Sequence, residues 1–181
     1  LLADLGLETR PQPEGLEVEE TGQTFAENAR LKAAAVALAT GCWALADDSG
    51  LSVAALGGAP GVHSARYADS DAARIERLLR ELAAAGADDA SARGARFTAA
   101  LALANPQGAI VLEVDGHCPG TILTAPRGSG GFGYDPVFHV PELGLTFAEM
   151  DKQQKACIGH RGRAFARLKP QLAALLSGST G

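Results

Sequence analysis

Residues 24–50 read TFAENARLKAAAVALATGCWALADDSG, and this stretch decides the class of fold that the sequence predicts. Its first residue, Thr24, is followed three residues later by a glutamate, which is the spacing of a capping box. An alanine-rich helix is therefore expected to begin there and to end near Gly41. The apolar residues 42–46 predict a short buried strand, and the polar residues 47–50 predict a turn.

The remaining elements continue this alternation outward along the chain. We expect a second helix capped by Ser70 or Asp71 and closed by Gly86, then a hairpin, two short strands and two further helices. The expected spans are Phe97–Ala104 and Ala109–Cys118 for the hairpin, Thr121–Thr124 and Val137–Val140 for the short strands, a short helix opened by Thr146, and Gly162–Ser177 for the last helix. The predicted fold class is α/β, with a mixed central sheet flanked by helices.

Composition and charge narrow the classes of function. The 181 residues, 46% hydrophobic and 20% charged, suit one globular domain, which can consist of two lobes. A net charge of −5 argues against a general nucleic-acid binder, and no apolar run approaches the ~20 residues that span a bilayer. The three cysteines are scattered and no signal peptide is recognisable, so we expect a cytoplasmic protein without nucleic-acid or membrane partners.

Acidic side chains form the first candidate site. Asp47 and Asp48 follow the apolar run, and Glu19, Glu20 and Glu27 lie before and within the first helix. Mg²⁺ in proteins binds a few carboxylates together with substrate phosphates, so this group suits a magnesium site. Neighbouring residues on a strand point to opposite faces, so only one of the two aspartates needs to face it. The alternative interpretation is a turn with solvated acids.

A glycine-rich segment, residues 128–136, forms the second candidate site. Its sequence is GSGGFGYDP, in which Phe132 and Tyr134 are embedded among five glycines. Glycine lets the backbone approach a ligand closely, and an aromatic ring can stack on a base. The segment lacks the G-K-[ST] of a phosphate-binding loop. The alternative interpretation is a flexible loop.

Basic side chains form the third candidate site. They crowd into one short segment and are Lys152, Lys155, His160, Arg161 and Arg163. Lysine and arginine bind phosphate oxygens, and arginine and histidine also donate to base edges. A charged helix start is the alternative, and Lys32 on the first helix is interpreted as a solvated surface lysine. An acidic group, an aromatic glycine loop and a basic segment together suit a nucleotide phosphate bound through magnesium.

At these residues the sequence closely resembles the inosine/xanthosine triphosphate pyrophosphatase family, which acts on dITP and XTP. Five motifs match in order between about Glu20 and Arg167. They are Glu20-Thr21-Gly22 with Thr24–Ala29, Ala46–Leu51, Gly57–Val62 with Ser64–Tyr67, Gly130–Pro136, and His160-Arg161-Gly162.

The resemblance implies a two-lobed α/β fold with a long mixed sheet, a homodimer, and Mg²⁺-dependent cleavage of purine triphosphates between the α- and β-phosphates. It implies that ITP, dITP and XTP are converted to monophosphate and pyrophosphate, which cleanses the nucleotide pool. By the family's pattern the site residues are Asp48 as general base and metal ligand, Glu20 as metal ligand, Ser49 on the triphosphate, Phe132, Gly133, Tyr134 and Asp135 around base and sugar, and Lys155, His160 and Arg161 on the nucleotide.

The chain departs from the family pattern in its N-terminal segment, at Ala156, which follows Lys155 where the family usually has asparagine, and at Gly159. Family members begin with a strand and a [ST]-x-N-x-x-K loop, and nothing before Glu20 matches them. We therefore expect a single pyrophosphatase-like domain over residues 1–181 that lacks this strand and loop. A glycine, Gly159, replaces the usual serine before His160, which is expected to be a mild change. Two alternatives follow: a truncated, catalytically impaired nucleotide-binding homologue, and a pyrophosphatase for other modified nucleotides, including pyrimidines.

Overall fold

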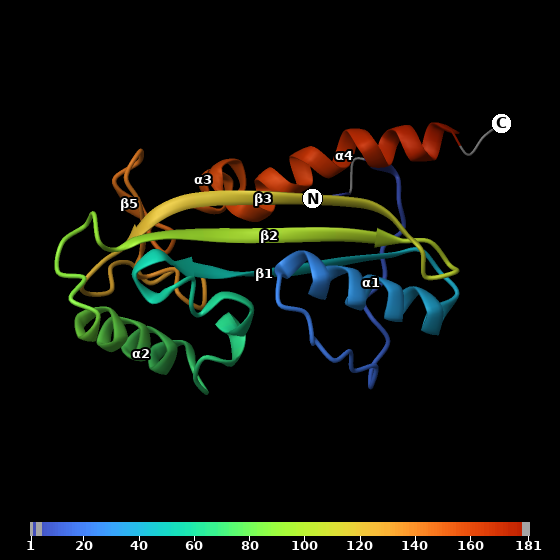
Figure 1. The fold of residues 1–181 in the computed structure, drawn as a ribbon. Coiled ribbons are helices and arrows are strands. Elements are labelled where there is room, and N and C mark those ends of the chain that lie inside the picture. The colour runs from blue at the N-terminus through green and yellow to red at the C-terminus, as the bar shows by residue number, and fades with distance from the viewer. Residues whose placement is uncertain (1, 3–4, 179–181) are drawn as a thin grey trace. The chain divides into compact units, whose positions relative to one another are not determined.

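The computed structural model describes residues 2 and 5–178, which form helices, five strands and connecting loops (Figure 1). The elements in chain order are α1 (Phe25–Thr40), β1 (Ala44–Val53), the 3₁₀ helices η2 (Ala54–Leu56) and η3 (Gly61–Arg66), α2 (Asp71–Ala84), β2 (Gly94–Ala104), β3 (Ile110–Ile122), β4 (Phe138–Val140), β5 (Leu145–Thr146), α3 (Lys152–Ile158) and α4 (His160–Gly178).

The strands form one sheet in the order β1-β2-β3-β4-β5. β4 pairs antiparallel with β3 and with β5, and the arrows of β1, β2 and β3 alternate in direction (Figure 1). The α/β class with a central sheet flanked by helices is confirmed. Among the described residues, neighbouring strands run antiparallel, so the parallel pairs that a mixed sheet implies are not among them.

The chain divides into two compact units, each with its own core. Unit 1 comprises residues 1–48, 99–116 and 160–181, and unit 2 comprises residues 49–98 and 117–159. Each of the three long strands contributes residues to both units, because the boundaries fall within β1, β2 and β3.

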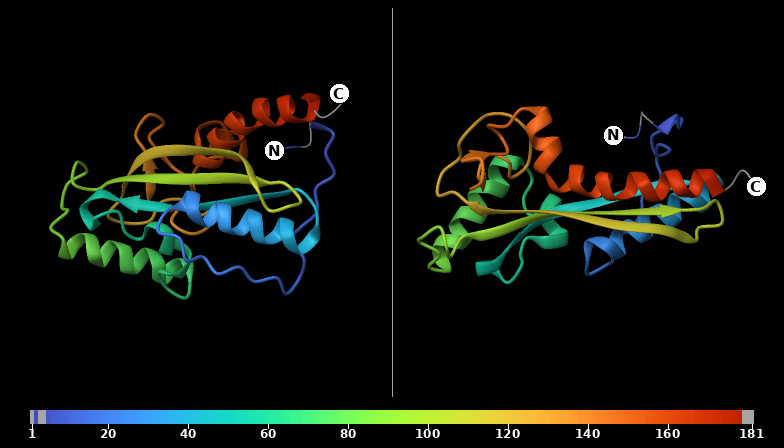
Figure 2. Two further views of the ribbon diagram at one scale, coloured as in Figure 1. Left: turned by 45° about the vertical axis from the view of Figure 1, so that its right-hand side comes forward. Right: turned by 90° about the horizontal axis from the view of Figure 1, so that it is seen from above.

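The core of unit 1 is built from small side chains on two helices. Buried alanines of α1 pack against Ala100, Ala102 and Ala104 of β2, whereas Ala164 and Leu168 of α4 pack against the alternate β2 residues, including Leu101. Because successive strand residues point to opposite faces, α1 and α4 cover opposite faces of the strands in unit 1 (Figure 2). Because alanine is small, the axis of α1 lies close to β2. The polar residues of α1 beside the buried alanines are therefore also held near the sheet.

The core of unit 2 is larger in its side chains and partly aromatic. Phe97 lies edge-on to Phe138, with ring centroids 4.6 Å apart, and stacks on Phe147 at 5.5 Å. Leu78 and Leu82 of α2 close the other side of this cluster. The predicted helix capped by Ser70 is confirmed, because the Ser70 side chain accepts a hydrogen bond from Ala73 N.

Local capping signals predict the first helix and the hairpin correctly. Thr24 and Glu27 form the reciprocal capping box of α1, and Gly41 ends the helix in a left-handed conformation. The expected hairpin is present as β2 and β3, joined where Asn105 Oδ1 accepts from Gln107 N and Ala109 N. β3 continues to Ile122, so the separate strand predicted at 121–124 is the end of β3.

Two local predictions are wrong. Residues 47–50 form no turn, because β1 continues through them to Val53, with Asp48, Gly50, Leu51 and Val53 buried. Pairing within the sheet outweighs the turn preference of this composition. Thr146 opens no helix, since it lies in β5 and its hydroxyl donates to Arg127 O. α3 begins instead after Asp151, which forms a capping box with Gln154.

Candidate active site

Asp48 lies in the middle of β1 with its carboxylate turned into unit 1. The residue is 7% exposed, and its Oδ1 accepts a hydrogen bond of 2.7 Å from Lys32 Nζ. Burial raises the pKa of the Asp48 carboxyl above its usual range, although the hydrogen bond and the charge of Lys32 act in the opposite direction. Burial outweighs the contact with Lys32, so the Asp48 carboxylate is a stronger base than a solvated one.

Lys32 brings the two acidic candidates of unit 1 together. Its Nζ lies 2.7 Å from Asp48 Oδ1 and 3.5 Å from Glu20 Oε1. The side chain is about four-fifths buried, so the interpretation of Lys32 as a solvated surface lysine is wrong. Lys32 is four residues after Asn28 on α1, which places both on the helix face that borders the buried alanines. This spacing was the sequence signal that could have identified Lys32.

The neighbouring aspartate has a different partner. Asp47 Oδ2 accepts a hydrogen bond of 2.8 Å from Arg161 Nε in the first turn of α4. Adjacent residues of β1 point to opposite faces, so Asp48 meets α1 while Asp47 meets α4. The structure thus brings Glu20, Lys32 and Asp48 together and places the Arg161 ion pair on the other face of the strand.

His160 begins α4 and is buried, with 8% of its surface exposed. The start of α4 approaches β3 so closely that a Cβ on Gly116 would lie 2.1 Å from His160 O and 2.4 Å from Ala164 N. Glycine at position 116 therefore lets the first turn of α4, which carries His160 and Arg161, lie against β3. Gly159, which precedes them, also lacks room, since a Cβ there would lie 2.4 Å from Lys155 O. A serine at this position would therefore need the Lys155 carbonyl to shift, and the expectation that glycine in its place is a mild change stays a prediction.

In unit 2 the glycine-rich segment is held by Asp135. This residue is 3% exposed, and its Oδ2 accepts from Phe132 N at 3.1 Å and from Lys155 Nζ. The Lys155 ammonium also lies 5.0 Å from the centre of the Phe132 ring. Gly131 adopts φ +71°, and a Cβ there would collide with the Asp135 carboxylate. These contacts fix the segment as a turn. The turn presents Phe132, which is 63% exposed, at the surface of unit 2.

The next residues of the same segment point inward. Gly133 N donates to Asp71 Oδ2 at 2.8 Å, and the Tyr134 hydroxyl donates to Ser64 O at 2.8 Å. Tyr134 is 4% exposed, and burial raises the pKa of its hydroxyl. Its side chain is therefore part of the core of unit 2 that supports the loop. Ser49, the next residue after Asp48, lies partly buried in β1.

Two carboxylates of unit 1 have the chemistry of a small cation site. Among the described residues, no three His, Cys, Asp or Glu side chains are grouped closely enough to hold a metal ion. Two carboxylates, Glu20 and Asp48, do share one cation, and Asp48 Oδ2 is a buried acceptor without a hydrogen-bond partner in the described chain. Mg²⁺ commonly takes one or two carboxylates and completes its shell with water and phosphate oxygens, so this donor set fits it.

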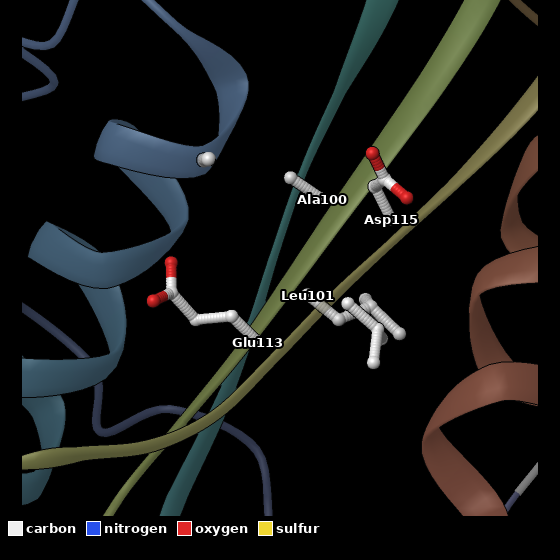
Figure 3. Close-up of a pocket in the computed structure, with 6 residues that line it drawn as sticks. Ala100, Leu101, Glu113 and Asp115 are labelled. Atoms are coloured by element: carbon white, nitrogen blue, oxygen red, sulfur yellow. The ribbon is translucent and has the colours of Figure 1, made fainter.

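A shallow recess elsewhere on unit 1 contains none of the predicted site residues (Figure 3). Its lining includes Glu113 and Asp115 of β3, which are paired with Arg30 and Arg167 at 2.8 and 2.7 Å. Both acidic side chains are thus already neutralised by exposed ion pairs. The recess therefore adds no chemistry to the candidate site.

Comparisons with known proteins agree on one family. The Ham1 family model matches residues 2–171. The dITP/XTP pyrophosphatase of Synechococcus sp. is 61% identical over all of this chain and 85% of its own length, and that of Nostoc sp. is 57% identical over 98% and 88%.

Solved structures lead to the same family. A HAM1 protein from Coxiella burnetii superposes with a TM-score of 0.80 at 48% identity, over 90% of this chain and 81% of its own. The dITP/XTP pyrophosphatase from Mycobacterium abscessus gives a TM-score of 0.73 at 43% identity, over 87% and 83%. None of the helices that the structure describes has the length and hydropathy of a membrane span.

Proposed function

The chain belongs to the Ham1 family, and from that premise we propose that it hydrolyses aberrant purine nucleoside triphosphates such as dITP and XTP to the monophosphate and pyrophosphate. The observation that carries the proposal is the buried Asp48 carboxylate, held by Lys32 beside Glu20, in a chain that is 61% identical to a dITP/XTP pyrophosphatase. The protein is then a hydrolase acting on an acid anhydride.

Asp48 is the general base of the reaction. Attack on the α-phosphorus requires a water molecule to lose a proton as the new P–O bond forms. The carboxylate has one oxygen fixed by Lys32, which leaves Oδ2 to accept that proton. The position of Asp48 within a strand, rather than in a mobile turn, holds this oxygen in one place.

Glu20 and Asp48 are the residues that would hold Mg²⁺. Bound there beside the phosphates, the ion would supply positive charge and make a nearby water easier to deprotonate. Lys32 holds the two carboxylates together through charge and hydrogen bonding, and its ammonium is a cation for phosphate oxygens as well. Leaving-group charge on the pyrophosphate is thereby balanced by groups that are already in position.

In unit 2 the glycine-rich turn provides the surface for the base and sugar. Phe132 supplies an exposed ring on which a purine can stack, and Lys155 stands beside the ring while it is held by Asp135. Gly133 has no side chain, so its backbone can approach the nucleotide closely. Tyr134 supports this arrangement from the core through its hydrogen bond to Ser64 O.

The choice of base depends on hydrogen-bond donors in the proposal. Hypoxanthine and xanthine carry a 6-keto group, whereas adenine carries a 6-amino group. His160 and Arg161 are donors, and the ion pair with Asp47 holds the Arg161 guanidinium in one orientation. A site built to donate to an oxygen strongly rejects an analogue that presents a second donor there.

The family resemblance also supports three proposals about the setting of the reaction. The protein is a homodimer, depends on Mg²⁺, and acts in the cytoplasm, where it cleanses the nucleotide pool of dITP, ITP and XTP. A light-scattering measurement on the purified protein tests the dimer, because a mass of about one chain contradicts it.

A nucleotide panel tests the proposed function. Pyrophosphate release is measured for dITP, ITP, XTP, dATP and dTTP, with Mg²⁺ and again after chelation by EDTA. The proposal predicts rapid release from the first three, little from dATP and dTTP, and loss of release with EDTA. Equal rates with dITP and dATP would contradict the substrate class, and faster release from dTTP would favour a pyrophosphatase for other nucleotides.

A further inference from the structure

The exposed ring of Phe132 stands on a backbone that is hydrogen-bonded on both sides of the residue. Phe132 N donates to Asp135 Oδ2 at 3.1 Å, and Phe132 O accepts from Asp135 N at 3.2 Å. The next amide, Gly133 N, donates to Asp71 Oδ2 at 2.8 Å, across 62 positions of sequence. Two carboxylates, one from the same segment and one from α2, thus fix the backbone under an exposed aromatic side chain.

These hydrogen bonds restrain a stretch of chain that has unusual freedom by composition. Glycines stand on both sides of Phe132, and Gly131 and Gly133 adopt left-handed φ values of +71° and +59°. Glycine loses more conformational freedom on ordering than any other residue, so ordering this stretch is costly. If the ordering took place only when a nucleotide binds, it would weaken the affinity. The contacts with Asp135 and Asp71 instead order the stretch before a ligand arrives.

Asp71 is itself held in place at the start of α2. Its Oδ1 accepts from Arg74 Nη1 at 2.6 Å. Arg74 Nε also donates to Ala68 O at 3.0 Å, and its Nη2 donates to Ala65 O, so this arginine joins the preceding segment to the helix. One oxygen of Asp71 is therefore fixed within its own part of the chain, and the other reaches the glycine-rich segment.

The exposure of Asp71 argues against a role in stability alone. Its side chain is 47% exposed, and an exposed ion pair such as that with Arg74 contributes little to stability. Asp135, by contrast, is 3% exposed and belongs to the core of unit 2. The contact of Asp71 with Gly133 thus adds little to the core, and its clearest consequence is the fixed position of the Phe132 backbone.

We propose that Asp71 is a positioning residue for the base of the substrate, because it orders, through the Gly133 amide, the turn that presents the Phe132 ring for stacking. The inference rests on the proposed function. Asp71 makes no contact with the nucleotide in this proposal and takes no part in the proton transfer at Asp48. Its removal therefore weakens substrate binding and leaves the chemical step as it is.

Asp71→Ala tests the contact by steady-state kinetics. We expect KM for dITP to rise about fivefold, with kcat within about twofold of the unchanged protein. Glu76→Ala is the matched control, because Glu76 is an exposed acid on the same helix and its loss changes the net charge equally. It should leave KM and kcat unaltered. A normal KM in Asp71→Ala, or an equal rise in Glu76→Ala, would overturn the inference.

A double variant with Phe132→Ala separates positioning from a general structural effect. If Asp71 acts through the ring, Asp71→Ala raises KM about fivefold in the unchanged protein and less than about twofold in the Phe132→Ala background. A fivefold rise in both backgrounds would contradict the proposal, because Asp71 would then act independently of the ring.

Amide hydrogen exchange, followed by NMR, gives a readout that does not depend on turnover. In the unchanged protein the Gly133 amide should exchange at least about tenfold more slowly than in an unstructured peptide. Asp71→Ala should remove this protection and Glu76→Ala should keep it. An unprotected Gly133 amide in the unchanged protein would overturn the inference, even if Asp71→Ala failed to fold.

The two proposals fail in different ways. Absence of pyrophosphate release by the unchanged protein contradicts the proposed function. A normal KM for Asp71→Ala, in an enzyme that does release pyrophosphate, contradicts only the role of Asp71.

Discussion

The two units treat their buried polar side chains in opposite ways. In unit 2 the buried Ser64, Arg93 and Asp135 are each satisfied several times, and Arg93 alone donates to three backbone carbonyls. In unit 1 the buried Asn28 and Asp48 each keep one atom without a partner in the described chain. An unsatisfied buried polar atom costs about 1–3 kcal/mol, a cost that these satisfied side chains of unit 2 do not carry.

This difference matches a division of labour between the units. Satisfied networks make unit 2 a rigid support for a presented loop, in which the exposed group is the Phe132 ring. Unit 1 contains the unsatisfied groups, and we propose that proton transfer takes place there. Substitutions should therefore lower kcat in unit 1 and raise KM or lower stability in unit 2.

The largest effect is expected for Asp48→Asn. The amide cannot accept the proton, so kcat for dITP should fall by about 10³-fold or more, while calorimetric nucleotide affinity changes little. Folding should be retained, because the change removes a partly desolvated charge. Turnover close to that of the unchanged protein would show that another group serves as base. It would contradict the assignment of proton transfer to Asp48 of unit 1.

The next effect is expected for Lys32→Met, which keeps the length of the side chain and removes the charge. Asp48 then lies buried without its cation, so kcat should fall by about 10–100-fold and the free energy of unfolding by about 1–3 kcal/mol. Steady-state kinetics measures kcat, and urea unfolding measures the free energy of unfolding. Adding Asp48→Asn should recover most of the stability, since no charge is then left alone.

Arg80→Met is the control for that variant. Arg80 is exposed on α2, so neither kcat nor stability should change noticeably. If Lys32→Met behaved in the same way, the contact between Lys32 and Asp48 would carry no energetic weight.

In unit 2, Phe132→Ala should act on binding. Stacking of a base on an aromatic ring contributes about 1–3 kcal/mol, so KM for dITP should rise about 10-fold while kcat stays within about threefold. Stability should hardly change, because the ring is 63% exposed. Leu143→Ala, another exposed apolar side chain of unit 2, is the control and should leave KM unaltered. A fall in kcat with unchanged KM would contradict the division between the units.

The smallest effect is expected for Tyr134→Phe. The change removes only the hydroxyl that donates to Ser64 O, so the unfolding free energy should fall by about 1 kcal/mol and KM should stay within about threefold. Thermal or urea unfolding measures the loss. A large rise in KM with unchanged stability would instead indicate that the hydroxyl contacts the substrate.

Much of the fold can be predicted from short sequence patterns, because helix caps and turns depend on contacts between residues that are close in the sequence. Thr24 with Glu27 and Ser70 each satisfy the exposed N–H groups at a helix start, and the structure uses them in that way. The turn predicted at 47–50 failed because strand pairing across the sheet, which no local pattern records, satisfies the backbone of β1. Thr146 failed for a similar reason, since its hydroxyl bonds to Arg127 from another segment.

The candidate site was accessible only in part. The sequence identified Glu20, Asp48 and the turn around Phe132 as groups with chemistry to offer. It did not reveal that Lys32 joins Glu20 to Asp48, nor that Asp47 turns away to Arg161, because both depend on which face of β1 each residue occupies. The side chain of Tyr134 lies in the core of unit 2, and its contact with the substrate stays a prediction.

Hydrolysis in water enriched in ¹⁸O tests most directly whether unit 1 activates water against the α-phosphorus. After one turnover of dITP with Mg²⁺, mass spectrometry of both products locates the oxygen that came from solvent. We predict that the label appears in the monophosphate and that the pyrophosphate stays unlabelled. Label in the pyrophosphate, or release of inorganic phosphate in its place, would contradict this account.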